Sequence, residues 1–166
     1  IKMSLLSLTS YIYFKNTFQV KSIYHVIFSI CYAFSGWVLL NYFNIMWLDD
    51  VILFPLIVLF LDKLLKEEKY IGYLITLTLS LIFSYYISTF ILLFILIYSF
   101  IYINLNMSKT KSKKTAITLG ITTLLSILIS SFSIGPAIMQ TINSSRLDGI
   151  SNTYLFNNTI NKLLYL

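Results

Sequence analysis

The sequence predicts an all-α, polytopic transmembrane helical bundle, and three observations support this fold class. Of the 166 residues, 58% are hydrophobic and only 11% are charged, whereas about 25% of an ordinary soluble domain is charged. A soluble fold of this length would bury only about 70% of its chain surface, which is too little to hide so many apolar side chains. The lysines lie in short groups between long apolar runs. This pattern is typical of loops that face anionic lipid, and it argues against a nucleic-acid partner despite the net charge of +6.

About six or seven membrane segments are expected, because a helix needs about 20 apolar residues to cross the hydrocarbon core. The apolar segments are residues 3–14, 22–43, 51–61, 70–103 and 115–135. The segment that contains Pro55 is too short to span alone, and the one from residue 70 is long enough for two spans with an apex at residues 84–89. Pro136 is expected to stop or kink the last complete span. The charged stretches between segments, residues 15–21, 62–69 and 104–114, are the expected connections.

The chain is expected to be part of one transmembrane domain over residues 1–166, truncated at both ends. It opens on Ile1 without an initiator Met and closes on an apolar run. Nine of the twelve basic residues fall in the three connections, which predicts that these connections are cytoplasmic. The Asp49-Asp50 pair, the apex at residues 84–89 and a polar outer loop at residues 137–156 are then extracytoplasmic, and the protein is a multi-pass protein of the bacterial cell membrane.

The adjacent carboxylates of Asp49 and Asp50 are the main candidate for chemistry, because no lysine or arginine stands beside them in the sequence. One reading is structural, since carboxylates at the start of a helix bond free backbone N–H groups and complement the helix dipole. The other reading is catalytic. A carboxylate recessed between helices can act as a general base, or can hold a divalent cation that neutralises a phosphate. The identity of any metal is left unknown.

Aromatic and basic residues near these carboxylates are candidates for substrate binding. Trp47 fits an interfacial belt, and it could also stack on a sugar ring. Tyr85 and Tyr86 are either interfacial anchors or part of a hydroxyl-rich patch that suits a polyhydroxyl substrate. Arg146 is the one arginine of the chain; it is suited to a lipid phosphate, or it pairs with Asp148.

Several motifs closely resemble the bacterial YfhO family of large polytopic membrane proteins with the GT-C glycosyltransferase architecture. They are Tyr32 to Leu39, Asn44 to Asp49, Pro55 to Ile57, Asp62 to Glu67 and Ser84 to Ile87. The resemblance is strong from residue 29 to residue 103 and weaker, but collinear, through Pro136 and Arg146. Two residues depart from the family's pattern: Asp50 is commonly a small residue in relatives, and Ser84 is more often Asn.

The resemblance implies extracytoplasmic transfer of a sugar from a polyprenyl-phosphate donor to a cell-envelope polymer such as lipoteichoic acid, in mostly Gram-positive bacteria. The usual catalytic carboxylate of this architecture lies in a first outer loop, which is expected to precede this fragment. Asp49 is then the matching acid, with Asp50 the less secure of the pair, and the substrate-binding candidates are Asn44, Trp47, Tyr85, Tyr86 and Arg146. Two alternatives stay open: a lipid or polymer transporter in which the acids couple ions, and a non-catalytic scaffold for a site built upstream.

Overall fold

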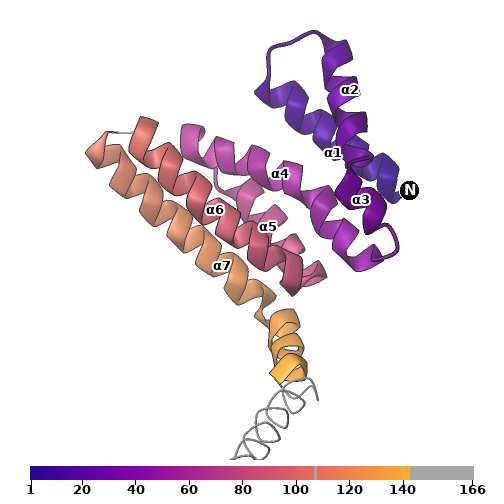
Figure 1. The fold of residues 1–166 in the computed structure, drawn as a ribbon. Helices are drawn as coiled ribbons and strands as arrows, with labels where there is room; N and C mark the ends of the chain where they lie inside the picture. The colour runs from indigo at the N-terminus through magenta and orange to yellow at the C-terminus, as the bar shows by residue number, and fades with distance from the viewer. Residues whose placement is uncertain (107, 143–166) are drawn as a thin grey trace, which may run out of the picture. The chain divides into compact units, whose positions relative to one another are not determined.

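The computed structural model describes residues 1–106 and 108–142, and these residues are helical throughout apart from short connections (Figure 1). The helices are α1 (Lys2–Thr17), α2 (Ser22–Ala33), α3 (Gly36–Leu40), α4 (Ile45–Glu67), α5 (Ile71–Phe83), α6 (Tyr85–Asn106) and α7 (Lys109–Ile142). The described part of the chain contains no strand, which confirms the all-helical prediction. By its contacts the chain divides into two compact units, Ile1–Ser131 and Phe132–Leu166, and of the second only the end of α7 is described.

Three helical stretches within the described residues are long and apolar enough to cross a membrane. They are Ser22–Leu40, which combines α2 and α3, Tyr85–Asn106, and Lys111–Pro136. Helix α5 is apolar but shorter. The prediction of a membrane protein is therefore supported, whereas six or seven membrane segments are more than these helices show. A helix break occurs at Ser84, the first residue of the predicted apex, whose extended backbone separates α5 from α6, whereas residues 85–89 of that apex already belong to α6.

All three predicted connections are shorter than expected, because helix continues into them: α1 reaches Thr17, α4 reaches Glu67, and α6 and α7 both enter residues 104–114. Residues 104–106 end α6, and the lysines from Lys109 onward already belong to α7. Helix α7 also passes through Pro136 and ends at Ile142, so of the two outcomes predicted for Pro136, a stop or a kink, the stop does not occur. The first residues of the predicted loop at residues 137–156 are thus helical, and the remainder of that loop, including Arg146, lies outside the described residues.

Helix α4 is longer than the segment predicted at residues 51–61, although it is not among the three stretches that are long and apolar enough to cross a membrane. It runs without interruption from Ile45 to Glu67 through Pro55, a length of 23 residues, or about 34 Å at the α-helical rise. A proline inside a helix leaves the carbonyl four residues earlier without its N–H donor, and here that carbonyl belongs to Val51. The hydroxyl of Tyr32 donates to the Val51 carbonyl oxygen at 2.8 Å. The helix therefore continues past Pro55 because a side chain from α2 replaces the missing backbone donor.

This replacement predicts that Tyr32→Phe destabilises the protein by about 1 kcal/mol, the net worth of one intramolecular hydrogen bond. In a Pro55→Ala background the restored amide of residue 55 can donate to Val51, so Tyr32→Phe should then cost little. Unfolding of the purified protein in mixed detergent, followed by circular dichroism, measures both effects. An equal cost in the two backgrounds would show that the tyrosine does not substitute for the missing N–H.

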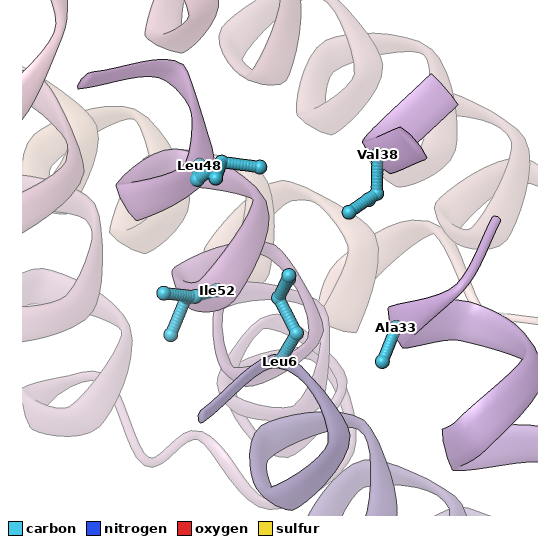
Figure 2. Close-up of a cluster of buried hydrophobic side chains, with 5 residues drawn as sticks. All are labelled: Leu6, Ala33, Val38, Leu48 and Ile52. Atoms are coloured by element: carbon cyan, nitrogen blue, oxygen red, sulfur yellow. The ribbon is translucent and has the colours of Figure 1, made fainter. Parts of the chain in front are cut away.

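Helix α4 is the centre of the first unit, because it packs against α1, α5 and α6. A buried apolar cluster joins it to the N-terminal helices (Figure 2): Leu6 from α1, Ala33 from α2, Val38 from α3, and Leu48 and Ile52 from α4. Lipid tails are as apolar as these side chains, so the cluster stabilises the bundle mainly by close packing rather than by exclusion of water.

Polar contacts fix the far end of α4. The hydroxyl of Tyr98 in α6 donates to Asp62 at 2.6 Å, and Lys66 lies 3.3 Å from the same carboxylate. In the turn that follows, Glu68 pairs with Lys114 of α7 at 2.7 Å, and this hydrogen bond lowers the pKa of the Glu68 carboxyl. Two of the three lysine-rich stretches of the sequence therefore meet at one end of the first unit, away from Asp49 and Asp50.

Candidate functional site

A cavity of about 580 Å³ lies beside the first turns of α4. Its walls come from α2, α3, α4 and α6 and from Ser35 between α2 and α3, and they are mostly aromatic and aliphatic. The aromatic lining residues are Tyr32, Trp37, Trp47, Phe54, Tyr86 and Phe90, and the single charged lining residue is Asp50. A mostly apolar concave site with one convergent polar group is the usual form of a small-molecule site in a protein.

Asp50 is fully buried, at 0% exposure, and serine hydroxyls from the α5–α6 region surround its carboxylate. Ser80 donates to Asp50 Oδ1 at 2.7 Å, and Ser88 lies 3.4 and 3.5 Å from the two carboxylate oxygens. Ser84, at the helix break, also hydrogen-bonds the carboxylate. A buried carboxylate is costly unless donors satisfy it, and the serines on both sides of the break supply them.

The hydrogen bonds among these groups form a chain. The Ser80 and Ser88 hydroxyl oxygens are 2.8 Å apart, closer than Ser88 is to either oxygen of Asp50. Each hydroxyl can donate one hydrogen bond. Ser80 donates to Asp50, so its oxygen can accept a hydrogen bond from Ser88. The carboxylate is thus held by a directed network that links α4, α5 and α6.

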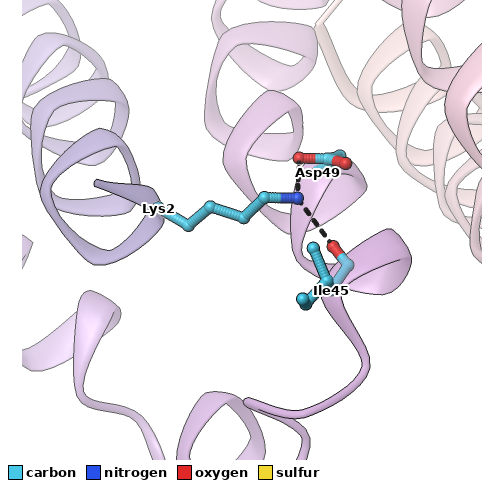
Figure 3. Close-up of polar contacts among 3 residues, drawn as sticks. All are labelled: Lys2, Ile45 and Asp49. Carbon is cyan, nitrogen blue, oxygen red and sulfur yellow. Dashed lines mark hydrogen bonds and ion pairs between the residues drawn. The ribbon is translucent and has the colours of Figure 1, made fainter.

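The side chain of Asp49, although adjacent to Asp50 in the sequence, points toward Lys2 of α1 (Figure 3). Lys2 Nζ of α1 lies 2.6 Å from Asp49 Oδ1 and also donates to the Ile45 carbonyl oxygen at 2.8 Å. Both side chains of this pair are 31% exposed. No lysine or arginine stands beside the two aspartates in the sequence, yet Asp49 is paired in the structure, because Lys2 reaches it across 47 residues.

The capping interpretation of the Asp pair was also wrong. Helix α4 begins at Ile45 with Asn44 as its N-cap, and its first turn contains no acidic residue. Both aspartates lie in the second turn, where their own helix already satisfies the backbone N–H groups. Within the described part of the chain, the Asn44 side chain itself makes no capping hydrogen bond.

The structure brings only some of the predicted binding residues together. Trp47 and Tyr86 stack with ring centroids 5.8 Å apart and an interplanar angle of 25°, and both line the cavity. Tyr85 and Asn44 are not among the residues that line it. The prediction for Arg146 falls outside the described residues.

Sequence reasoning missed Ser80, Tyr32 and Lys2 as parts of this region. One signal for the serines is present in the sequence, because Ser80, Ser84 and Ser88 recur at intervals of four residues, the spacing that places side chains on one face of a helix. The partners of Tyr32 and Lys2 lie far along the chain and leave no such signal. Among the described residues, no three of the His, Cys, Asp and Glu side chains come close enough to hold a metal ion.

Helices of membrane-spanning length, which enclose a buried carboxylate and an aromatic cavity, define a polytopic helical membrane protein. The family model described as "Bacterial membrane protein YfhO" matches residues 1–165. The chain therefore belongs to the YfhO family of bacterial membrane proteins, as the motifs predicted. No curated protein and no solved structure gives a significant match.

Proposed function

We propose that this chain is part of an extracytoplasmic glycosyltransferase of the GT-C type, which moves a sugar from a polyprenyl-phosphate donor to a cell-envelope polymer such as lipoteichoic acid. Membership of the YfhO family supports a membrane glycosyltransferase in general terms. The observation that carries the proposal further is the Asp50 carboxylate, fully buried at the wall of an aromatic cavity of about 580 Å³.

In this proposal Asp50 is the general base. The acceptor hydroxyl oxygen attacks the anomeric carbon of the sugar, the bond from that carbon to the phosphate oxygen breaks, and the hydroxyl proton passes to the carboxylate. The polyprenyl phosphate leaves with the bonding electron pair. A positioned base of this kind contributes about 10²–10⁴ to the rate. The serines hold the carboxylate in one orientation before the acceptor arrives.

The aromatic walls suit the sugar. Trp37 and the stacked pair of Trp47 and Tyr86 line the cavity on the same side of the bundle as Asp50, and flat aromatic faces pack well against the C–H faces of a sugar ring. The phosphate of the donor needs a cation, and Arg146 of the predicted outer loop remains the candidate for that contact.

The lysine distribution supports an outward-facing site. The Asp62–Lys66 and Glu68–Lys114 pairs mark one end of the first unit, and the α5–α6 break and Asp50 mark the other. If the lysine-rich end faces the cytoplasm, as the positive-inside rule predicts, the cavity opens toward the extracytoplasmic face, where cell-envelope polymers are found.

Transfer by the purified full-length protein tests the proposal. In detergent, with radiolabelled polyprenyl-phosphate hexoses as donors and lipoteichoic acid as acceptor, we expect label to move from lipid to polymer. A transporter needs two compartments and would leave the donor intact under these conditions. If the donor stays intact in detergent but crosses the bilayer of proteoliposomes, the protein is a transporter and not an enzyme. Asp50 would then couple ions.

A further inference from the structure

A second cavity, of about 410 Å³, lies at the turn between α4 and α5, far along α4 from Asp50. Helix α4 contributes Phe60 and Lys63 to its lining, and the turn and the start of α5 contribute residues 68–72. The ring of Phe60 lies directly against Gly72, where a Cβ atom would collide with it. The aromatic wall is therefore fixed by close contact between the two helices.

The cations at this cavity are available to a ligand. Lys63 Nζ lies over the Phe60 ring, 5.4 Å from its centroid, and forms no ion pair with any described residue. Lys69 pairs with Glu67 at 2.7 Å, but both side chains are well exposed, at 74% and 49%. Exposed pairs of this kind contribute little free energy, so Lys69 can exchange its partner for an anion at small cost.

The acid in the lining does not cancel this positive charge. Glu68 pairs with Lys114 at 2.7 Å, and Lys111 is also near enough to favour its ionised form, so its negative charge is shared with lysines of α7. Around the turn, Lys63, Lys66, Lys69, Lys111 and Lys114 face the three acids Asp62, Glu67 and Glu68. The lysines around the turn outnumber the acids, so the turn keeps a net positive charge even after its ion pairs are taken into account.

The position of the cavity combines this charge with an apolar wall. Phe60 and Ile71 line it beside the lysines, and Ile71 and Tyr70 are exposed, at 65% and 48%. An apolar helix begins at this point, which in a membrane is the level of the lipid headgroups. A ligand that fits must present an anion next to hydrocarbon.

We propose that this cavity binds the headgroup of an anionic phospholipid. The phosphate would lie between the ammonium groups of Lys63 and Lys69, and the glycerol and first methylenes would pack against Phe60 and Ile71. The site is separate from the Asp50 cavity, and the proposal does not depend on glycosyl transfer. Basic pockets between membrane helices are a recurrent form of lipid recognition.

Native mass spectrometry of the delipidated full-length protein tests this site, with phosphatidylglycerol, phosphatidylcholine and inorganic phosphate as separate probes. We expect phosphatidylglycerol to bind more tightly than phosphatidylcholine. Each lysine near an anionic lipid is worth about 1 kcal/mol, so Lys63→Gln should weaken phosphatidylglycerol binding about fivefold, and the double variant with Lys69→Gln about 25-fold. Lys63→Arg should restore most of the affinity.

Lys113→Gln is the matched control, because Lys113 is exposed near the start of α7 and does not line the cavity. It removes the same charge and should leave the affinity unchanged. Equal binding of the two lipids, or equal losses in Lys63→Gln and Lys113→Gln, would overturn the proposal. Tight binding of inorganic phosphate that displaces the lipid would assign the site to a free anion and would also overturn it.

Discussion

Asp50→Asn in the full-length protein should lower the rate of sugar transfer about 100-fold or more, while the protein remains folded in the membrane. The amide oxygen of asparagine can still accept the hydrogen bond from Ser80, which in turn accepts from Ser88, so the network around residue 50 is largely preserved. The amide cannot take a proton from the acceptor hydroxyl at neutral pH, and loss of a general base typically costs two to four orders of magnitude. Initial rates with saturating donor, together with the membrane abundance and thermal stability of the variant, measure the effect.

Asp49→Asn is the matched control for this substitution. It makes the same chemical change one residue earlier, but the Asp49 carboxylate pairs with Lys2 and is partly exposed, and it does not line the cavity. Exposed ion pairs are worth about 0–1 kcal/mol, so most of the transfer rate should remain. The reverse result, with activity lost in Asp49→Asn and kept in Asp50→Asn, would reinstate Asp49 as the base. Full activity in both would make this region a scaffold for a site elsewhere.

The different surroundings of the two aspartates show what the sequence could not supply. Successive residues of an α-helix project about 100° apart, so Asp49 meets Lys2 of α1 while Asp50 meets the serines of α5 and α6. The absence of a neighbouring lysine or arginine drew attention to the Asp pair, and the motif match favoured Asp49, because Asp50 is commonly a small residue in relatives. Which acid is buried depends on helices 30 or more residues away, and a local pattern does not contain that information.

Some helix boundaries could likewise be predicted from the local sequence, and others could not. The composition alone predicted a helical membrane protein, and the polar run after Phe83 predicted the break that the structure has at Ser84. The length of α4 was missed, since Pro55 signals a helix end by every local rule. Helix α4 continues because Tyr32, from another helix, donates to the Val51 carbonyl. At Pro55 the local rule fails because a distant side chain supplies the donor that the proline removes.

The second largest effect is expected from Ser80→Ala, and we expect this substitution mainly to lower the stability of the protein. Ser80 is fully buried and donates the shortest hydrogen bond that the structure gives to Asp50. Removal of its hydroxyl also takes away the acceptor of Ser88. A buried charged group that loses its partner costs about 1–3 kcal/mol or more, so the free energy of unfolding in mixed detergent should fall by roughly that amount.

A double-mutant cycle identifies the cause of this loss. In an Asp50→Leu background the carboxylate is replaced by an apolar side chain of similar size, so Ser80→Ala should cost little, since removal of both partners is nearly neutral. Ser130→Ala is the control, because Ser130 is also fully buried and donates to the carbonyl of Ser126 in its own helix, and its cost should not depend on residue 50. If Ser80→Ala costs the same with and without Asp50, the serine stabilises only the α5–α6 packing. A coupling free energy of about 1 kcal/mol or more would show that Ser80 stabilises the protein through the Asp50 carboxylate.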